Sequence, residues 1–190
     1  MDGIIRIWDV QTGHLVEHLR GHGKAVCSVA FMPDDRGLVS GSDDKKIKRW
    51  DLTPFLECDA RTEPLPSASC SERSTDVPVK EGGERGSICT LTFDGHKDWV
   101  RSLAVGHDGQ WLASGSEEKS VLFWDVQNAQ LQFALHGHQS WVFSVDMSPT
   151  EDFFATGDGL GTTRICELFF RIYNALPNAN ASREVQTYRS

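Results

Sequence analysis

The chain has 190 residues, of which 39% are hydrophobic, and a formal net charge of −8. It has no run of Lys or Arg, so we expect no direct binding to nucleic acid or acidic lipid. No stretch approaches 18 uninterrupted apolar residues, so no membrane span is predicted. The five cysteines show no close pairing, which is typical of a reducing compartment.

Alternating apolar residues between turn-forming residues predict strands along most of the chain. Two strands open it, over residues 4–9 and 14–19. The next group has four strands, over 26–31, 38–42, 47–52 and 88–93. Two further groups follow, with strands over 100–105, 111–116, 121–126 and 131–135, and then over 142–147, 153–156 and 163–168.

Two stretches lie outside this pattern. Residues 53–87 are rich in Pro, Ser, Glu and Gly and poor in large apolar side chains, so they predict a flexible polar insertion. A tolerated loop and a regulated docking segment both fit this composition. Residues 169–190 are predicted to form an atypical C-terminal tail.

A Gly-His pair and a Trp-Asp pair recur at a fixed distance. His22 lies 28 residues before Trp50, His96 lies 28 before Trp124, and His138 lies 28 before Cys166, where Cys-Glu replaces Trp-Asp. This recurrence resembles the WD repeat, in which about 40 to 45 residues form one four-stranded blade of a β-propeller. The resemblance implies an all-β fold over residues 1–168, with a blade remnant at 2–19 and repeats at 22–52 plus 88–93, 96–135 and 138–168.

These repeats amount to about three and a half blades, whereas propellers typically close with four to eight. An incomplete arc leaves an unpaired face at each end. We therefore expect the chain to be a C-terminal fragment, or a truncated gene model, of a larger propeller protein. Expressed alone, the chain is expected to aggregate or to pair its exposed sheet edge with another polypeptide.

The WD resemblance also implies a buried hydrogen-bond relay in each repeat. In this relay the His bridges a turn carboxylate and a strand hydroxyl, and the hydroxyl contacts the Trp. Such groups are buried together only when each finds a partner. The matching residues are His22, Ser40, Asp44 and Trp50, then His96, Ser114, Glu118 and Trp124, and finally His138 and Thr156.

The third repeat departs from the relay pattern. Leu160 stands at the position of the carboxylate and Cys166 at that of the Trp. We expect His138 to lose two partners, which would make this blade the weakest because an unpaired buried imidazole costs about 1 to 3 kcal/mol.

The His, Ser and acidic residues of each repeat also suggest the Ser-His-Asp set of a hydrolase. A nucleophile is needed once, whereas this set recurs at constant spacing, so we interpret it as architecture and predict no catalytic residue. His136 and His138 form the one close His pair, with no third ligand near them in sequence. We therefore predict no metal site and no cofactor.

Partner binding is expected on one rim of the propeller, formed by the loops that carry the relay His and carboxylate residues. Exposed Trp and Arg side chains are typical anchors for a partner. The alternative, in which Trp99 and Trp141 pack beneath neighbouring blades, fits the sequence equally well. The candidate rim residues are Trp99, Arg101, Trp141, Phe143, Asp43 and Glu117.

Several segments go beyond a generic propeller. Residues 8–19, 95–104 and 115–125, the motif Phe-Ala-Thr-Gly at 154–157, and the long insertion ahead of Gly95 resemble the fungal Tup-type general transcriptional corepressor, a Groucho-like WD family. The resemblance covers about residues 2–157. It implies a nuclear, non-enzymatic scaffold that sequence-specific DNA-binding repressors recruit.

In that family the full-length protein also binds a tetratricopeptide-repeat partner, histones and deacetylases. Nothing in this sequence matches the N-terminal helical region of the family, so the resemblance extends only to the propeller. Two alternatives stay open: a WD scaffold of another complex, such as a ubiquitin-ligase substrate receptor, and a nonfunctional truncated product.

Overall fold

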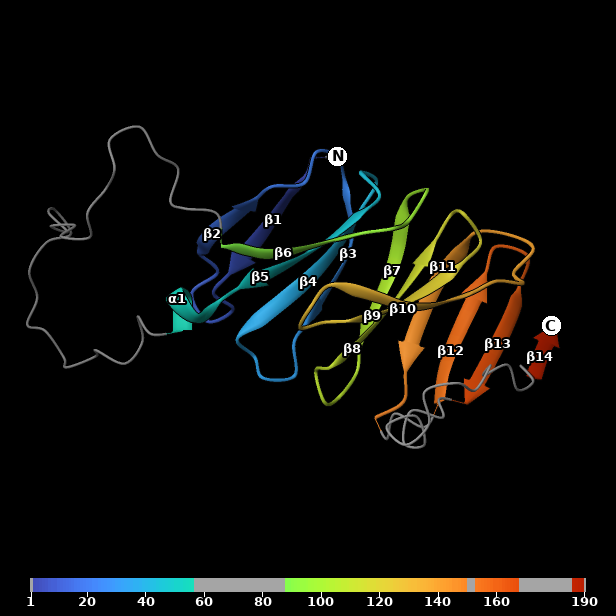
Figure 1. The fold of residues 1–190 in the computed structure, drawn as a ribbon. Helices are drawn as coiled ribbons and strands as arrows, with labels where there is room; N and C mark the ends of the chain where they lie inside the picture. The colour runs from blue at the N-terminus through green and yellow to red at the C-terminus, as the bar shows by residue number, and fades with distance from the viewer. Residues whose placement is uncertain (1, 57–87, 150–152, 168–185, 190) are drawn as a thin grey trace, which may run out of the picture.

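The computed structural model describes residues 2–56, 88–149, 153–167 and 186–189. Within them, four antiparallel sheets follow one another along the arc shown in Figure 1. The first sheet, here called the remnant sheet, has strands β1 (Ile4–Trp8) and β2 (Leu15–Arg20).

Three four-stranded blades follow. Blade 1 has β3 (Val26–Phe31), β4 (Gly37–Ser42), β5 (Lys46–Asp51) and β6 (Cys89–Asp94). Blade 2 has β7 (Val100–Val105), β8 (Trp111–Ser116), β9 (Val121–Asp125) and β10 (Gln130–Leu135). Blade 3 has β11 (Val142–Met147), β12 (Phe153–Asp158), β13 (Thr162–Glu167) and β14 (Gln186–Arg189).

The strands of each blade are hydrogen-bonded in chain order. The first strands, β3, β7 and β11, lie against one another and form the inner side of the arc. The remnant sheet corresponds to the third and fourth strands of a blade, because Trp8 pairs with Leu15 as Trp124 pairs with Leu131. The predicted all-β propeller arc of about three and a half blades is confirmed.

Strand β14 corrects the prediction that residues 169–190 form only an atypical tail. It pairs with β13 in an antiparallel register that sets Thr162 opposite Arg189, and it completes blade 3. The sequence did not indicate this strand because Gln186–Arg189 carries no run of alternating apolar residues. The segment expected to be a flexible insertion begins with a single helical turn, α1 (Thr53–Leu56), and residues 57–87 lie outside the described part.

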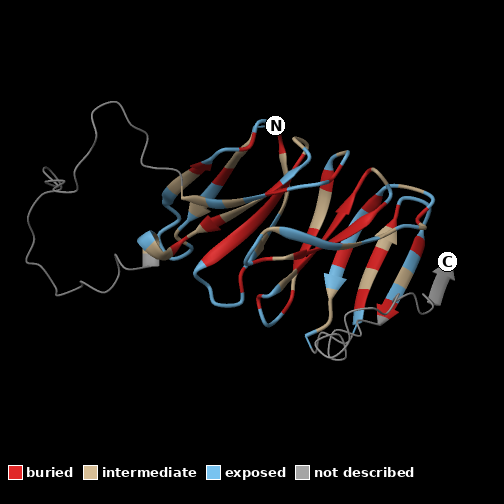
Figure 2. Ribbon diagram, viewed as in Figure 1, coloured by how far each residue is buried: buried red, intermediate tan, exposed pale blue. Residues whose placement is uncertain are grey.

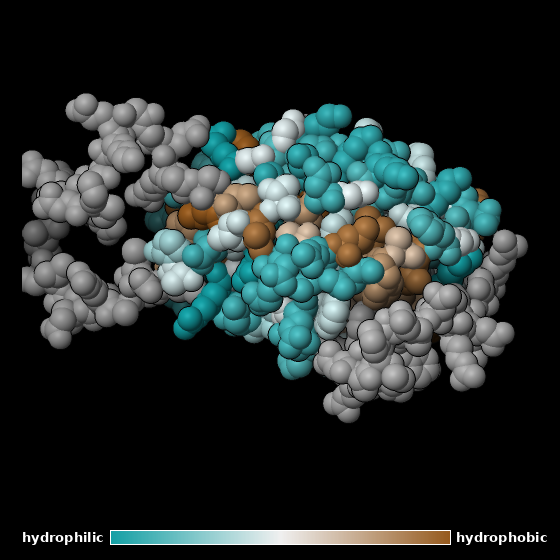
Figure 3. Space-filling model, viewed as in Figure 1, coloured by the Kyte–Doolittle hydropathy of each residue, from teal (hydrophilic) through white to brown (hydrophobic). Residues whose placement is uncertain are grey.

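The hydrophobic core lies between successive sheets, where Figure 2 shows most of the buried residues. Ile5 and Leu19 of the remnant sheet pack with Trp50 of blade 1. The cluster between blades 1 and 2 contains Val39, Ile47, Val100, Leu103 and Trp124. The cluster between blades 2 and 3 contains Phe123, Val142 and Phe154. The surface in Figure 3 is accordingly mostly hydrophilic, with hydrophobic areas in separate patches.

Two contacts repeat between adjacent blades. A Cβ added to Gly41 would lie 2.6 Å from Val100 Cγ1, and one added to Gly115 would lie 2.7 Å from Val142 Cγ1. Glycine therefore lets the second strand of one blade approach the first strand of the next. Nearer the axis, the Leu103 amide donates to Ser28 Oγ at 3.2 Å and the Val145 amide to Ser102 Oγ at 3.1 Å.

Candidate functional site

The structure brings the relay residues of the first two repeats together. In blade 1, the two ring nitrogens of His22 lie 2.8 Å from Asp44 Oδ2 and 2.7 Å from Ser40 Oγ. Trp50 Nε1 donates to the same Ser40 oxygen at 2.8 Å.

Blade 2 repeats this geometry with His96, Ser114 and Trp124, and with Glu118 as the carboxylate. The longer Glu118 does not distort the turn. Lys45 and Lys119, which follow the two carboxylates, adopt similar left-handed φ values of 72° and 69°.

The direction of each hydrogen bond follows from the chemistry of the partners. A carboxylate only accepts, so Nδ1 of each imidazole carries the proton that faces it. Burial lowers the pKa of His22 below its ordinary value, although Asp44 opposes this effect. The neutral ring then accepts a hydrogen bond from the Ser40 hydroxyl at Nε2, while Ser40 Oγ accepts one from Trp50 Nε1. Every polar group of the relay has a partner, so the set fixes the loop, the turn and two strands without a catalytic role.

The relay predicts that acid destabilises the fold. Burial opposes ionisation of Asp44, but hydrogen bonds from His22, Gly23 and Lys46 hold its pKa below the ordinary value. Glu118 and Asp158 have lowered pKa values too, each through its His partner.

Groups with a lower pKa in the folded state than in the unfolded state contribute stability at neutral pH and lose it as the pH falls through the folded pKa. The loss should begin below pH 6.5, the ordinary value for His, and deepen in the carboxylate range. Urea unfolding midpoints at pH 7, 5 and 4 measure it.

A second Asp→Asn variant, which removes the same charge elsewhere, serves as the control for this prediction. Asp44→Asn removes the carboxylate that opposes the lowering of the His22 pKa, so it should enlarge the fall in midpoint between pH 7 and pH 4. Asp34→Asn, in an exposed turn, should leave the fall unchanged. A midpoint that stays constant or rises on acidification of the wild-type chain would contradict the prediction.

The third relay differs from the prediction in its carboxylate. Asp158, rather than residue 160, lies 2.8 Å from His138 Nδ1, and Thr156 Oγ1 lies 2.8 Å from Nε2. His138 therefore keeps both partners, and the expectation that it loses two is wrong. What this relay lacks is the Trp donor to Thr156, because Cys166 stands opposite Phe154 where Trp124 stands opposite Leu112.

Asp158 makes the hydrogen bonds that two separate residues make in the other blades. In blade 1, Ser42 Oγ accepts from the Asp44 amide, and Asp44 Oδ1 accepts from the Lys46 amide. In blade 3, Asp158 Oδ1 accepts from the amides of Leu160 and Thr162 at 3.0 Å each, while Oδ2 faces His138. A carboxylate at the end of the strand replaces the serine and the turn carboxylate together, which the spacing of the repeats did not indicate.

Arg164 occupies part of the space left by the missing Trp. In blades 1 and 2 the indole edge lies over Gly21 and Gly95, 3.1 and 2.8 Å from where a Cβ would sit. In blade 3 the guanidinium of Arg164 lies over Gly137 and donates from Nη2 to its carbonyl oxygen. Arg164 Nε is buried with no partner among the described residues, so this substitute is incomplete.

On the rim, Arg101 joins blade 2 to blade 1. Its guanidinium donates to Glu117 in its own blade, with Nε 2.7 Å from Oε1, and Nη1 lies 3.7 Å from Asp43 Oδ1 of blade 1. Cys27 Sγ donates to the same Asp43 oxygen at 2.9 Å and accepts from Arg101 at 3.5 Å. Burial and Asp43 raise the pKa of the Cys27 thiol to about 11, so it stays protonated. Arg101, Asp43 and Glu117 are thus engaged with one another.

The aromatic rim candidates are exposed. Trp99 is 36% exposed and has Arg101 4.9 Å above its ring. Trp141 and Phe143 are 47% and 50% exposed and form an edge-to-face pair with ring centroids 6.0 Å apart. Neither Trp is packed beneath a neighbouring blade. The exposed aromatic surface of the rim therefore consists of Trp99, Trp141 and Phe143, and their role in binding stays a prediction.

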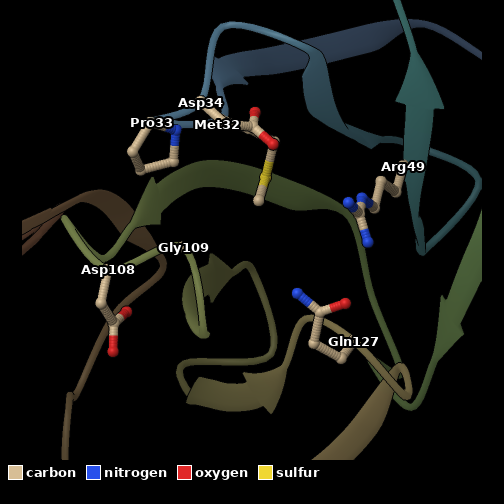
Figure 4. A pocket seen from close by; sticks show the side chains of 7 residues that line it. All are labelled: Met32, Pro33, Asp34, Arg49, Asp108, Gly109 and Gln127. Atoms are coloured by element: carbon tan, nitrogen blue, oxygen red, sulfur yellow. The ribbon is translucent and has the colours of Figure 1, made fainter.

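A small hollow lies at the opposite ends of the strands, between blades 1 and 2 (Figure 4). Its volume is about 90 Å³, well below the roughly 300 Å³ of the smallest typical ligand pockets. Its lining includes the carboxylates Asp34 and Asp108 and one guanidinium, Arg49. Among the described residues, no cluster of His, Cys, Asp and Glu has the form of a metal site. Within the same residues, no helix has the length and apolar character needed to cross a membrane.

Comparisons with known proteins agree with this geometry. The family described as "WD domain, G-beta repeat" matches residues 13–51, 87–125 and 129–166. The solved structure of U3-55K superimposes with a TM-score of 0.60 at 18% identity, over 79% of this chain and 38% of that one. At this identity the likeness shows the fold alone.

Two curated relatives indicate different biological settings. The transcriptional repressor rco-1 of Neurospora crassa is 42% identical over 86 residues, covering 43% of this chain and 14% of the relative. The nuclear distribution protein PAC1 of Arthroderma otae is 29% identical over 200 residues, covering 86% of this chain and 43% of the relative. The chain thus spans less than half the length of either relative.

Proposed function

Because this chain belongs to the WD domain, G-beta repeat family, we propose that it is a non-enzymatic scaffold of a general transcriptional corepressor that acts in the nucleus. Its rim binds sequence-specific DNA-binding repressors. Histones, deacetylases and a tetratricopeptide-repeat partner join through the full-length protein.

The observation that carries this proposal is the exposed aromatic surface of the rim. Trp141 and Phe143 are each about half exposed, although a folded chain gains free energy by burying such groups. Arg101 and its acidic partners satisfy one another, so the neighbouring charges do not compete for a ligand. A site with large apolar anchors beside satisfied polar groups suits an extended peptide of a partner protein.

The likeness to rco-1 and the Tup-type motifs favour the corepressor role. A second candidate role, in nuclear distribution, is favoured by the greater share of the chain that PAC1 matches. The two roles predict different phenotypes. Loss of the gene should raise transcription of repressed genes under the first role, and should misplace nuclei under the second.

The rim is tested by tethering the chain to a reporter promoter through a heterologous DNA-binding domain. We expect reporter transcription to fall with the wild-type chain. The double variant Trp141→Ala, Phe143→Ala should restore transcription, because truncating such anchors weakens the binding of a partner by at least about tenfold. Phe153→Ala is the matched control, since Phe153 is equally exposed in blade 3 but lies at the opposite end of the strands. Full repression by the double variant, or no repression by the wild-type chain, would contradict the proposal.

A further inference from the structure

Blades 2 and 3 present different side chains at the same two positions of the rim. In blade 2 these positions hold Arg101 and Glu117, whose side chains are joined by hydrogen bonds. In blade 3 they hold Phe143 and Gly159. A Cβ on Gly159 would lie 2.9 Å from Phe143 Cε2, so the absence of a side chain there makes room for the ring. An apolar contact thus replaces the charged pair in blade 3.

Leu160 adds to the apolar surface of blade 3. It stands at the position of the relay carboxylate, but Asp158 has taken over that role, and Leu160 is 66% exposed. The amide of the preceding residue, Gly159, donates to the Trp141 carbonyl oxygen at 3.0 Å, so this turn lies beside the loop that carries Trp141. The apolar patch of the rim consists of Trp141, Phe143 and Leu160.

The rim of blades 1 and 2 carries exposed lysines in the corresponding loops and turns. The Lys45 ammonium donates to the Lys97 carbonyl oxygen at 2.6 Å, which places a lysine from the blade 1 turn on the loop of blade 2. Blade 3 has Gln139 and Gly161 at the positions of Lys97 and Lys119. The lysines therefore lie on one side of the apolar patch. They are Lys24, Lys45, Lys97 and Lys119.

The carboxylates of the same loops are less exposed than the lysines, and each already accepts a hydrogen bond or pairs with a cation. Arg101 and the relay histidines contact four of them, and Asp98 accepts from the backbone amide of Trp99 at 3.0 Å. These carboxylates belong to Asp43, Asp44, Glu117, Glu118 and Asp98. Among the described residues, no ion pair involves Lys24, Lys97 or Lys119. A ligand that reaches the rim of blades 1 and 2 therefore meets ammonium groups first, although the whole chain has a net charge of −8.

We propose, building on the function proposed above, that the peptide bound by the rim has an apolar part and an acidic part. Its apolar residues lie on the apolar patch of blade 3, and its Asp and Glu residues lie over the lysines of blades 1 and 2. Exposed ion pairs contribute little individually, so the apolar part supplies most of the affinity. The acidic part sets the orientation of the peptide and speeds its association.

The probe is a phage-displayed library of random dodecapeptides, selected on the full chain. We expect the selected sequences to combine aromatic or aliphatic residues at one end with Asp and Glu at the other. A synthetic peptide with the commonest selected sequence is then titrated into the chain by calorimetry. Raising the salt concentration from about 0.05 M to about 0.5 M should weaken this peptide by about threefold or more, because the lysines are exposed and their attraction is screened.

Variants assign the two parts of the peptide to the two parts of the rim. Trp141→Ala should weaken the peptide by about tenfold or more. Lys119→Glu should weaken it by about fivefold, and Arg36→Glu, the same charge reversal in an exposed turn at the opposite end of the strands, should leave it unchanged. A peptide with Asn and Gln in place of its Asp and Glu should bind the wild-type and Lys119→Glu chains equally, because the coupling between the charges is gone.

The possible failures can be told apart. If no peptide is selected, or if Trp141→Ala binds the selected peptide as tightly as the wild-type chain, the proposed function and the two-part peptide are both overturned. If the selected peptides require Trp141 but have no excess of Asp and Glu, or if Lys119→Glu leaves their affinity unchanged, only the acidic part of the proposal is overturned. The rim then remains a site for a peptide of other chemistry.

Discussion

Replacing Trp124 by alanine is expected to lower the free energy of unfolding by about 3–5 kcal/mol, the range for removing a fully buried large aromatic side chain. Trp124 is fully buried, packs edge-on against Phe93 and donates to Ser114 Oγ at 2.8 Å. The substitution leaves a cavity between blades 1 and 2 and removes a donor from the relay. Domains are stable by only about 5–15 kcal/mol, so this variant should be largely unfolded at moderate urea concentrations. Urea denaturation followed by circular dichroism measures the change.

Two further variants separate packing from hydrogen bonding. Trp124→Phe removes the indole donor and keeps most, though not all, of the buried ring volume, so a smaller loss of about 1–3 kcal/mol is expected. Trp8→Ala removes the same residue type at the same repeat position, where it is exposed, and should cost less than about 0.5 kcal/mol. Equal losses for Trp8→Ala and Trp124→Ala would show that burial between blades does not determine the contribution of this Trp.

The fold and most of the relay could be predicted from the sequence because both depend on constant spacing. A distance of 28 residues between His and Trp keeps the loop, two strands and the turn in register, so His96, Ser114 and Trp124 meet as expected. The strand limits follow in the same way. Predicted and observed bounds agree for β3, β7, β8 and β11.

The departures arise where one residue takes over the role of another. Asp158 replaces a serine and a carboxylate, and Arg164 fills part of the place of a Trp, and both substitutions lie at positions that the repeat pattern assigns to other chemistry. Strand β14 is separated from β13 by residues outside the described part, and its pairing depends on backbone hydrogen bonds rather than on an apolar pattern. The engagement of Arg101 with Asp43 depends on the distance between two blades, which spacing within one repeat does not encode.

Replacing Gly115 by valine is expected to destabilise the chain by about 3 kcal/mol, at the upper end of the range for overpacking a core. A Cβ at this position would lie 2.7 Å from Val142 Cγ1 and 3.2 Å from Val145 Cγ2, and both neighbours are buried in the interface between blades 2 and 3. Valine adds two further carbon atoms, so the blades must separate. Thermal and urea unfolding measure the loss.

The matched control is Gly157→Val, at the same position of the last blade. There a Cβ would have only Ser144 Cβ of its own blade within 4 Å among the described atoms, at 3.9 Å, so no neighbouring blade has to move. The expected change is within about 0.5 kcal/mol. If Gly157→Val destabilised the chain as strongly as Gly115→Val, glycine would be required by the conformation of the strand. A loss confined to Gly115→Val would show that the approach of the next blade requires it.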